Sequence, residues 1–522
     1  MAEKVVAQVD ELQDGQMKQV SVGGRTALLL RQGGDYYAIG AKCTHYGAPL
    51  EDGLLHEGRI ICPWHRACFD ALTGDVQEPP ALDALANFEV AVEGEDVVVT
   101  VPDEAPSERT MPMARCNPDR DDRHFVIVGG GAAGNAAAEA LRQEGVEGRI
   151  SVITKEKEIP YDRPDLSKDF LASTKRSKLP ALRSRDFYEE HDVELLTGRT
   201  VASVEVNDRI VELEDGSSMR ADALLLATGG RPRRLDVEGG GLDNVLTLRS
   251  FRDCLRIKEA AQEGAAAVVV GASFIGMETA WRLADRGVKV TVVAPESVPF
   301  ERVLGGDVGG MFQSMHQEQG VRFALGHTID RFEGEGALEA AVLDDGTRLE
   351  ADFVLQGVGV TPVTDYLQGV ELNDDGSVSV NANLQLARGV WAAGDIARFP
   401  DWRTGEPIRI EHWRLAEQHG RVAAMNMAGR EVPFRSAPFF WTLHGHFSLN
   451  YVGYVSDWDE VILQGDPADK KFLAYFVKDG RVLALAGARE TARIAAALHL
   501  IEKGQMPTPD EVREGADPRE RL

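Results

Sequence analysis

The chain has 522 residues, 43% hydrophobic and 27% charged, which is enough for three or four domains of ordinary soluble composition. A net charge of −27 argues against nucleic-acid or anionic-membrane partners, because both are themselves negative. Five cysteines do not suggest a disulfide scaffold. The first residues lack an apolar signal core, and no run of about 18 apolar residues exists. We therefore expect no membrane span and a cytoplasmic location.

Residues 1–102 carry short apolar runs separated by glycine-rich turns and no long helical period, which predicts antiparallel β structure. Two mixed pairs stand between these runs: Cys43 with His45 and, after 16 intervening residues, Cys62 with His65. Two thiolates and two imidazoles can bind either zinc or a [2Fe–2S] cluster. Classical zinc fingers, however, pair two cysteines and then two histidines, usually around a helix.

The segments 43–50 and 62–70 resemble the cluster-binding loops of the Rieske domain. The resemblance implies that the two cysteines bind one iron and the two histidines the other, which raises the potential relative to all-cysteine clusters. Some Rieske domains join these loops by a further disulfide, but Ala48 leaves Cys68 without a partner there. This points to the lower-potential, ferredoxin-like type. Arg66 departs from the pattern, since many relatives carry glycine after the second histidine.

Residues 125–156 read strand, tight turn, helix, strand and carboxylate in that order. Three glycines allow a sharp turn, close approach of a pyrophosphate and close helix–strand packing, and the helix N-terminus offers free N–H groups. The carboxylate comes 22 residues after the last glycine, near where a ribose-binding acid belongs. We predict a dinucleotide site here, with a plain βαβ crossover as the alternative. Its residues are Gly129, Gly131, Ala133, Gly134 and Glu156.

The same pattern recurs at residues 267–296, with a serine in place of the middle glycine. Each copy is followed by a β-meander with an Asp-Gly turn. Two nucleotide sites in tandem make a chance match improbable. The residues of the second site are Gly271, Ser273, Ile275, Gly276 and Glu296.

Three further strands end in turns that suit a nucleotide. The turns contain Thr228 and Gly229, Gly359, and Gly394 with Asp395. Asp395 is placed to accept a hydrogen bond from a ribitol hydroxyl, with a helix cap as the alternative.

These motifs resemble the two-dinucleotide flavoproteins of the pyridine nucleotide-disulfide reductase superfamily. No redox Cys-x4-Cys pair follows the first unit, and residues 160–168 look like the ferredoxin-reductase and apoptosis-inducing-factor branch. The resemblance implies FAD, with electrons leaving one at a time and no disulfide relay. It places Lys168 near flavin N5, paired with Glu278; a first-turn acid on a helix dipole is the alternative for Glu278. It also implies cofactor contacts for Arg163, Arg231, His412, Trp413 and Trp441, with a structural histidine as the alternative for His412.

The fold class we predict is multidomain: an all-β Rieske domain, an α/β two-dinucleotide fold of the glutathione-reductase type, and an α+β domain. Residues 103–122 lack periodicity and are rich in proline and charge, so we predict a linker there. The domains are 1–102 (Rieske), 103–122 (linker), 123–245 and 373–430 (FAD), 246–372 (NAD(P)H), and 431–522 (C-terminal).

The predicted activity is hydride transfer from NADH to FAD, followed by single-electron transfer through the [2Fe–2S] cluster to an external acceptor. A carboxylate at Glu296 repels a 2′-phosphate and favours NADH over NADPH, although Arg302 keeps NADPH open. The acceptor is a ferredoxin, an oxygenase, a cytochrome or a small molecule, and a homodimer is compatible with the sequence. Two alternatives stay open: direct reduction of an external ferredoxin by the flavin, and an NADH-responsive redox sensor.

Overall fold

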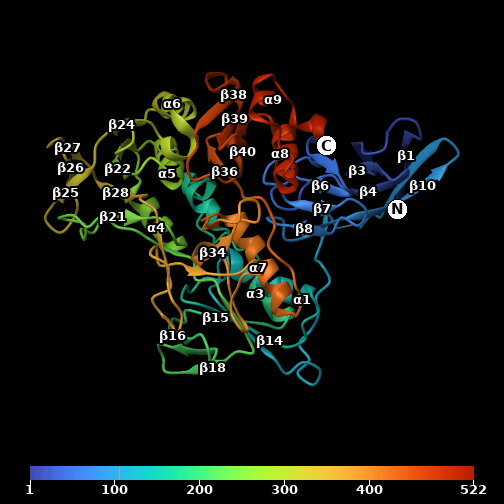
Figure 1. Ribbon diagram of the computed structural model, residues 1–522, viewed down its shortest axis with the longest axis horizontal. Helices are drawn as coiled ribbons and strands as arrows, with labels where there is room; N and C mark the ends of the chain where they lie inside the picture. Colours follow the sequence, from blue (N-terminus) through green and yellow to red (C-terminus); the bar gives the residue numbers. More distant parts are fainter. Residues whose placement is uncertain (105) are drawn as a thin grey trace.

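The computed structural model describes residues 1–104 and 106–522. Figure 1 shows four parts: a blue N-terminal β domain at the right, a red C-terminal domain at the top, a yellow-green nucleotide-binding half at the left, and the first nucleotide-binding half below. The red domain lies between the yellow-green half and the blue domain. Among the described residues, no helix is both long and apolar enough to cross a membrane.

The N-terminal domain consists of two antiparallel sheets. The larger has the order β1-β11-β10-β4-β3-β2, with β1 (Ala2–Gln8), β2 (Met17–Val22), β3 (Arg25–Gln32), β4 (Asp35–Gly40), β10 (Asn87–Glu93) and β11 (Asp96–Val101). The smaller is β5 (Leu54–His56), β6 (Arg59–Ile61), β7 (Cys68–Asp70) and β8 (Val76–Glu78). Successive residues of β3 face opposite sides: Leu28 and Leu30 pack toward the cysteine loops, whereas Ala27 and Leu29 fill a second core.

The connector between the first two domains is tied down at both ends. Strand β12 (Glu108–Arg109) pairs with β9 (Ala84–Leu85), and Arg109 donates to Thr73 O at 2.7 Å. Further along, Asn117 N donates to Glu147 O at 2.8 Å. Part of the predicted linker is therefore a strand, because β9 presents an open edge to it.

The first nucleotide-binding half contains a six-stranded sheet of order β15-β14-β13-β19-β33-β32, parallel except for β32. Its strands are β13 (His124–Val128), β14 (Arg149–Thr154), β15 (Val193–Thr197), β19 (Ala223–Leu226), β32 (Gln385–Ala387) and β33 (Val390–Ala392). Helices α1 (Ala132–Gln143) and α7 (Trp413–Met427) cross so closely that a Cβ on Gly420 would lie 2.1 Å from Ala133 O. The remaining pieces are α2 (Asp169–Ala172), α3 (Arg185–Glu190), β16 (Val201–Glu205), β17 (Ile210–Leu213), β18 (Ser218–Arg220), β30 (Leu367–Gln368), β31 (Val378–Ser379), β34 (Ala397–Pro400) and β35 (Pro407–Ile408).

The second half repeats the design with a five-stranded parallel sheet, β21-β28-β22-β23-β24. The strands are β21 (Val245–Thr247), β22 (Ala266–Val270), β23 (Lys289–Ala294), β24 (Arg322–Leu325) and β28 (Phe353–Gln356). Its helices are α4 (Phe251–Ala260), α5 (Phe274–Asp285) and α6 (Glu301–Glu318), and its meander is β25 (Ile329–Glu333), β26 (Ala340–Leu343) and β27 (Arg348–Glu350). The pair β20 (Gly230–Pro232) and β29 (Val360–Pro362) joins the two halves.

The C-terminal domain is an antiparallel sheet of order β36-β37-β40-β39-β38 covered by a helix. The elements are β36 (Phe439–His444), β37 (Phe447–Gly453), β38 (Glu460–Asp466), β39 (Lys471–Lys478), β40 (Arg481–Ala488), α8 (Thr491–Lys503) and α9 (Pro509–Arg513). Helix α8 ends at Gly504, whose φ of 67° suits glycine. The predicted all-β, α/β and α+β sequence of domains is thus confirmed.

Candidate active site

A cleft of about 1380 Å³ is lined by both nucleotide-binding halves and by strands β36 and β37. Most of the predicted site residues belong to its wall. They are Gly129, Gly131, Ala133, Glu156, Arg163, Lys168, Thr228, Gly229, Arg231, Ser273, Ile275, Glu278, Gly359, Gly394, Asp395, His412, Trp413 and Trp441. Gly134, Gly271, Gly276 and Glu296 are not part of the wall.

The first glycine turn is held by close backbone contacts. Gly129 has a φ of 119°, and a Cβ there would lie 2.2 Å from Ala227 O. A Cβ on Gly134 would lie 1.8 Å from Gly129 O, so the helix reaches the turn only with glycine. Gly131 is the N-cap of α1, where no side chain caps the helix. The N–H groups of the first helical turn therefore remain available to an anion.

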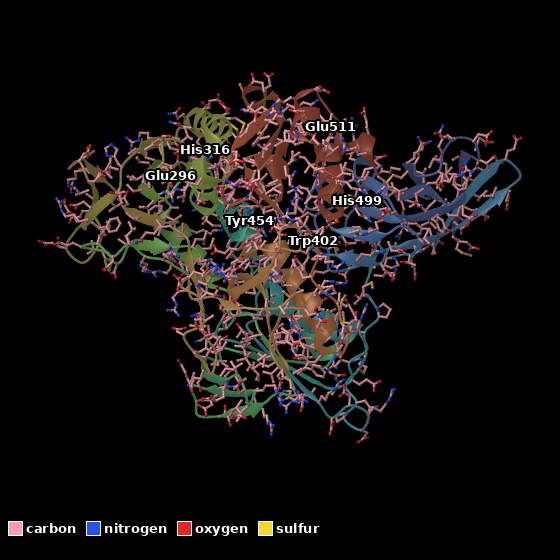
Figure 2. All side chains as sticks on the ribbon, viewed as in Figure 1. Glu296, His316, Trp402, Tyr454, His499 and Glu511 are labelled. Atoms are coloured by element: carbon pink, nitrogen blue, oxygen red, sulfur yellow. The ribbon has the colours of Figure 1, made fainter. Side chains whose placement is uncertain are left out.

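The second turn repeats this geometry. A Cβ on Gly271 would lie 2.4 Å from Gly357 O, and one on Gly276 would lie 2.1 Å from Gly271 O. The N-cap of α5, Ser273, makes no capping hydrogen bond, which leaves a second free helix N-terminus. Glu296 follows β23 in the yellow-green half (Figure 2), and Arg302 Nε lies 3.2 Å from its Oε1.

Glu156 is engaged by neighbours from its own loop. Arg163 Nη2 donates to Oε1 at 2.7 Å, and Tyr161 Oη donates to Oε2 at 2.5 Å. Burial acts to raise the pKa of Glu156, but the Arg163 guanidinium and the Tyr161 hydroxyl outweigh it and hold that pKa below its usual value. An ionised carboxylate on the cleft wall can accept hydrogen bonds from a sugar hydroxyl.

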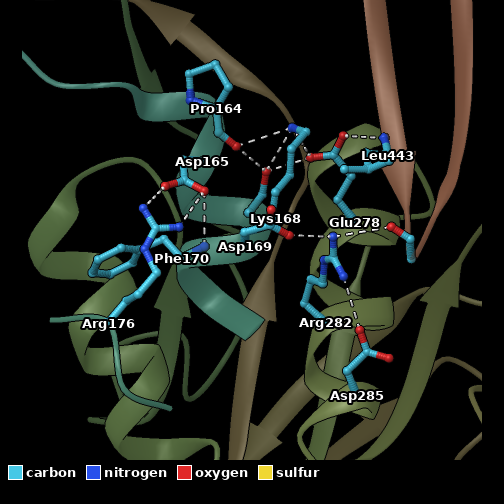
Figure 3. A network of polar contacts seen from close by, with 12 residues as sticks. Pro164, Asp165, Lys168, Asp169, Phe170, Arg176, Glu278, Arg282, Asp285 and Leu443 are labelled. Atoms are coloured by element: carbon cyan, nitrogen blue, oxygen red, sulfur yellow. Dashed lines mark hydrogen bonds and ion pairs between the residues drawn. The ribbon is translucent and has the colours of Figure 1, made fainter. Parts of the chain in front are cut away.

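Lys168 and Glu278 meet in the network shown in Figure 3. Lys168 Nζ donates to Glu278 Oε2 at 2.8 Å, and Ser167 Oγ donates to the same oxygen at 2.5 Å. Thr442 Oγ1, from the C-terminal strand β36, donates to Oε1 at 2.8 Å, and Leu443 N does so at 3.3 Å. The carboxylate of Glu278 is 2% exposed, so four donors replace its water. The alternative role of Glu278, an interaction with a helix dipole, is too weak to account for this network.

Another part of the wall carries a third carboxylate, Asp395, and an imidazole, His412, with one unpartnered nitrogen. Arg249 Nη2 donates to Asp395 Oδ2 at 3.0 Å, and Gly394 before it has a φ of 73°. Burial lowers the pKa of His412 to about 4, so the ring is neutral. Its Nδ1 is buried and has no hydrogen-bond partner among the described residues. Such an orphaned atom on a cleft wall indicates a polar ligand group opposite it.

The predicted cluster ligands stand on two facing loops. In the first loop Cys43 N donates to Ala48 O at 2.9 Å, and in the second Cys62 N donates to Ala67 O at 2.8 Å. All five cysteines of the chain are free, and Cys68 is a buried thiol that accepts from Arg59 Nε at 3.1 Å. This confirms that no disulfide joins the loops.

The four ligands form two pairs. The side chains of Cys43 and Cys62 interact, and the partner Cys43 lowers the pKa of Cys62. His45 Nδ1 and His65 Nδ1 lie 3.1 Å apart, and burial lowers the pKa of both rings, so both are neutral. No three of the four bring ligand atoms within 4.8 Å of one another. A single tetrahedral zinc would need all four to converge, so the pairs fit a two-iron cluster better.

The histidine pair lies against the wall of the cleft. The His65 ring centroid is 4.3 Å from that of Trp441, which lines the cleft. Tyr46, in the first ligand loop, donates from Oη to Asp162, close to the cleft-lining Arg163. The cleft and the candidate cluster site are therefore separated by one aromatic side chain.

Comparison with known proteins agrees with this arrangement. Residues 123–420 match the family described as pyridine nucleotide-disulphide oxidoreductase, residues 2–89 match the Rieske [2Fe–2S] domain, and residues 439–522 match the reductase C-terminal domain. The chain belongs to the pyridine nucleotide-disulphide oxidoreductase family. Apoptosis-inducing factor 3 of Mus musculus is 38% identical over 521 residues, which cover 98% of this chain and 86% of the relative.

Two further relatives of this oxidoreductase are reductases. The benzene 1,2-dioxygenase system ferredoxin–NAD(+) reductase subunit of Pseudomonas putida is 32% identical over 390 residues, which cover 74% of this chain and 95% of the relative. The crystal structure of the covalent putidaredoxin reductase–putidaredoxin complex is similar with a TM-score of 0.71 at 29% identity, covering 76% of this chain and 96% of that one. The predicted family, enzyme class and cofactors FAD, NADH and [2Fe–2S] are confirmed.

The residues of this family member fit those cofactors. Two uncapped helix N-termini suit two diphosphates, the orphaned His412 Nδ1 suits a polar ring edge, and two thiols with two neutral imidazoles suit the cluster. The role of each residue stays a prediction.

Some residues that bond the predicted site residues of the oxidoreductase are not themselves among the predicted ones. Ser167, Arg249 and Thr442 each bond a predicted site residue. Ser167 and Thr442 are direct neighbours of Lys168 and Trp441, which was the only sequence signal for them. Arg249 is 146 residues from Asp395, and nothing local marks it.

Proposed function

We propose that this oxidoreductase takes electrons from NADH in its cleft and delivers them singly, through its own Rieske domain, to an external acceptor. When bound, FAD accepts a hydride from the nicotinamide, and the cluster carries single electrons. The chain's own residues bind, align and connect these groups. The observation that carries the proposal is the contact between His65 and Trp441, with ring centroids 4.3 Å apart.

That contact supplies a short path from the cleft to the cluster site. Trp441 lines the cleft, and the half-buried His65 packs against it. The contact is present in the fold as it stands, so electron delivery to the cluster requires no movement of the Rieske domain.

Within the cleft, we propose that the two helix N-termini hold the diphosphates and that Glu156 and Asp395 accept hydrogen bonds from sugar or ribitol hydroxyls. Lys168 places a positive charge on the wall, where it favours electron-rich states of a bound ring. Glu278 fixes the position of Lys168 through its 2.8 Å contact.

The test is an anaerobic NADH titration of the holoenzyme, followed by optical and EPR spectroscopy. The wild type should lose flavin absorbance and gain the signal of a reduced cluster together. The variant His65→Asn removes one cluster ligand and should keep flavin reduction by NADH but lose delivery to cytochrome c. The exposed His446→Asn is the matched control and should behave as the wild type.

The proposal is overturned if His65→Asn reduces cytochrome c or a ferredoxin at the rate of the wild type. It would favour direct reduction from the flavin, with the Rieske domain only docked. Slow turnover with every acceptor, in wild type and variant alike, would favour the sensor function.

We also propose three finer points. Five free thiols are typical of a reducing compartment, which supports a cytoplasmic location testable by cell fractionation.

The names of the reductase relatives support a ferredoxin or an oxygenase component as acceptor, and the net charge of −27 favours one with a basic surface. A homodimer stays a prediction that sedimentation of the holoenzyme tests.

A further inference from the structure

A second group of metal-ligand side chains lies outside the redox site, at the junction of the Rieske domain and helix α8. His56 ends β5, Glu57 follows in the β5–β6 turn, and His499 lies on α8. One ligand atom of each lies within 4.8 Å of the others. Figure 2 labels His499 on the red helix where it faces the blue domain.

The three side chains converge from rigid elements. The His56 and His499 ring centroids are 4.4 Å apart, with ring planes at 75°. His499 Nε2 lies 3.9 Å from Glu57 Oε2. His499 is only 9% exposed, and Ala495, one turn earlier on α8, packs on Ile61 of the neighbouring strand β6. Ligands held by packed elements need little reorganisation to bind an ion.

We propose that His56, Glu57 and His499 bind a divalent transition-metal ion of the zinc type, which joins the Rieske domain to the C-terminal domain. Two imidazoles and one carboxylate are the donor set that zinc and its neighbours prefer, whereas magnesium and calcium prefer oxygen ligands alone. Glu57 is exposed, so water completes the coordination. None of these three described residues lines the cleft, so the group is a separate site.

The ammonium group of Lys503 balances the negative charge of Glu57. Its Nζ lies 3.2 Å from Glu57 Oε2, and it stands one helical turn after His499. The ammonium supplies the positive charge next to the carboxylate, and its side chain is exposed enough to move aside when a cation binds.

Because the ligands come from both domains, the ion binds only to the docked arrangement and favours it by mass action. The β5–β6 turn belongs to the same small sheet that leads into the second cluster loop, residues 62–67. The proposed ion therefore fixes the turn end of β6, whose other end leads into the second cluster loop.

The experiment measures zinc, iron and FAD per chain in the holoenzyme, after zinc loading and gel filtration, together with the thermal midpoint. Wild type should gain one zinc at unchanged iron and FAD, with a higher midpoint, and magnesium should give neither effect. His56→Gln and Glu57→Gln, both in the β5–β6 hairpin, should weaken zinc binding at least about tenfold. Their iron and FAD contents report whether they are folded, and His499→Gln provides a second test from the helix side.

The matched control is His327→Gln. His327 lies in a superficially similar group with Asp344 and Asp345, but it offers a single imidazole already bonded through Nδ1 to Asp344 at 2.9 Å. This variant should bind zinc as the wild type does. The proposal is overturned if wild type gains no zinc at tenfold molar excess, if zinc enters only as iron leaves, or if His327→Gln loses as much zinc as His56→Gln.

Discussion

Glu278 is the side chain on which three segments of the molecule meet. Its oxygens accept from the loop that carries Lys168, and from β36 through Thr442 and Leu443. Each acceptor position is filled, so the carboxylate has one orientation. Thr442 thereby connects the C-terminal sheet to the position of Lys168, and Trp441, next to Thr442, touches His65. A single strand thus positions both the cation and the contact to the cluster site.

We predict that Thr442→Val slows flavin reduction by NADH about tenfold, which equals about 1.4 kcal/mol of transition-state stabilisation. The substitution keeps the side-chain volume but leaves Glu278 Oε1 with only the 3.3 Å bond from Leu443 N. Losing a partner of a buried acceptor also costs about 1–3 kcal/mol of folding free energy. Stopped-flow absorbance and thermal unfolding measure the two effects. Thr442→Ser keeps the hydroxyl and should restore both; an unchanged rate in Thr442→Val contradicts the positioning role.

We predict that Glu296→Gln lowers the NADH-to-NADPH ratio of kcat/KM about tenfold, or about 1.4 kcal/mol. The substitution removes repulsion of a 2′-phosphate and releases Arg302, now 3.2 Å from the carboxylate and 79% exposed, to meet that phosphate. Steady-state rates with both nucleotides measure the ratio. Glu301→Gln removes the same charge nearby and should leave the ratio unchanged. If wild type, Glu296→Gln and Glu301→Gln have the same NADH-to-NADPH ratio of kcat/KM, Glu296 does not discriminate between the two nucleotides at the ribose.

At the scale of elements, the sequence predicts a turn or helix most accurately where the backbone geometry allows only one residue type. Gly134 and Gly276 must lack a Cβ because each would strike a carbonyl oxygen, at 1.8 Å and 2.1 Å, and both glycine turns are where the motif places them. Helix α8 likewise carries local signals, an apolar pattern and a glycine, Gly504, directly after its last residue. Strand β12 was missed, because its only partner, β9, is set by the tertiary fold.

Helix α8 also carries a buried carboxyl group with a testable pH dependence. Burial raises the pKa of Glu502 to about 7, and its Oε1 accepts from Ala437 N at 3.2 Å. The folded state therefore holds this proton more tightly than the unfolded chain. Stability from this group is present at about pH 4.5 and is lost as pH rises through about 7.

We predict that Glu502→Gln stabilises the protein at pH 8 by about 2–3 kcal/mol and changes little at pH 5. Glutamine keeps an oxygen for Ala437 N–H and never ionises. Thermal midpoints of variant and wild type at the two pH values measure the difference. A shift of equal size at both would mean that packing, and not ionisation, is responsible.

At the scale of the whole molecule, buried ion pairs hold the Rieske domain against the flavin half. Arg414 of α7 is 1% exposed and donates to Glu78 Oε2 at 2.6 Å and to Arg66 O at 3.1 Å. Arg183 joins Asp83 of the Rieske domain to Glu139 of α1, at 2.6 Å and 2.9 Å. Breaking one such pair leaves a buried charge and costs about 3–5 kcal/mol. The contact is therefore persistent.

This docking was not predictable from the sequence. Arg414 and Glu78 are 336 residues apart, and each is an ordinary charged residue in its own segment. The sequence marks Arg66 only as a departure from glycine. In the structure it adopts a φ of 61°, is fully buried, and donates to Thr491 O at 3.1 Å at the start of α8. The arginine thus connects the second cluster loop to the C-terminal domain. The glycine pattern of the loop alone does not predict that Thr491 is its partner.

A fixed, buried interface predicts that reduction of the cluster by NADH is independent of salt. The two sites lie in one chain and meet through His65 and Trp441, so no charge-steered encounter precedes the transfer. We expect the rate of cluster reduction to stay within about twofold between about 0.02 M and about 0.5 M NaCl, because buried pairs are little screened. Reduction of cytochrome c, a basic partner of a chain with a net charge of −27, should fall steeply over the same range.

Stopped-flow spectroscopy at the cluster wavelength measures the first step, and cytochrome c absorbance measures the second in the same samples. Arg414→Gln leaves Glu78 with Arg59 and Gln418 as partners, loosens the docking, and should introduce a salt dependence into the first step. Arg430→Gln removes the same charge from an exposed pair with Glu144 and should not. If wild-type cluster reduction falls with salt as cytochrome c reduction does, the Rieske domain is not held in place, and the cluster receives its electrons only in transient encounters.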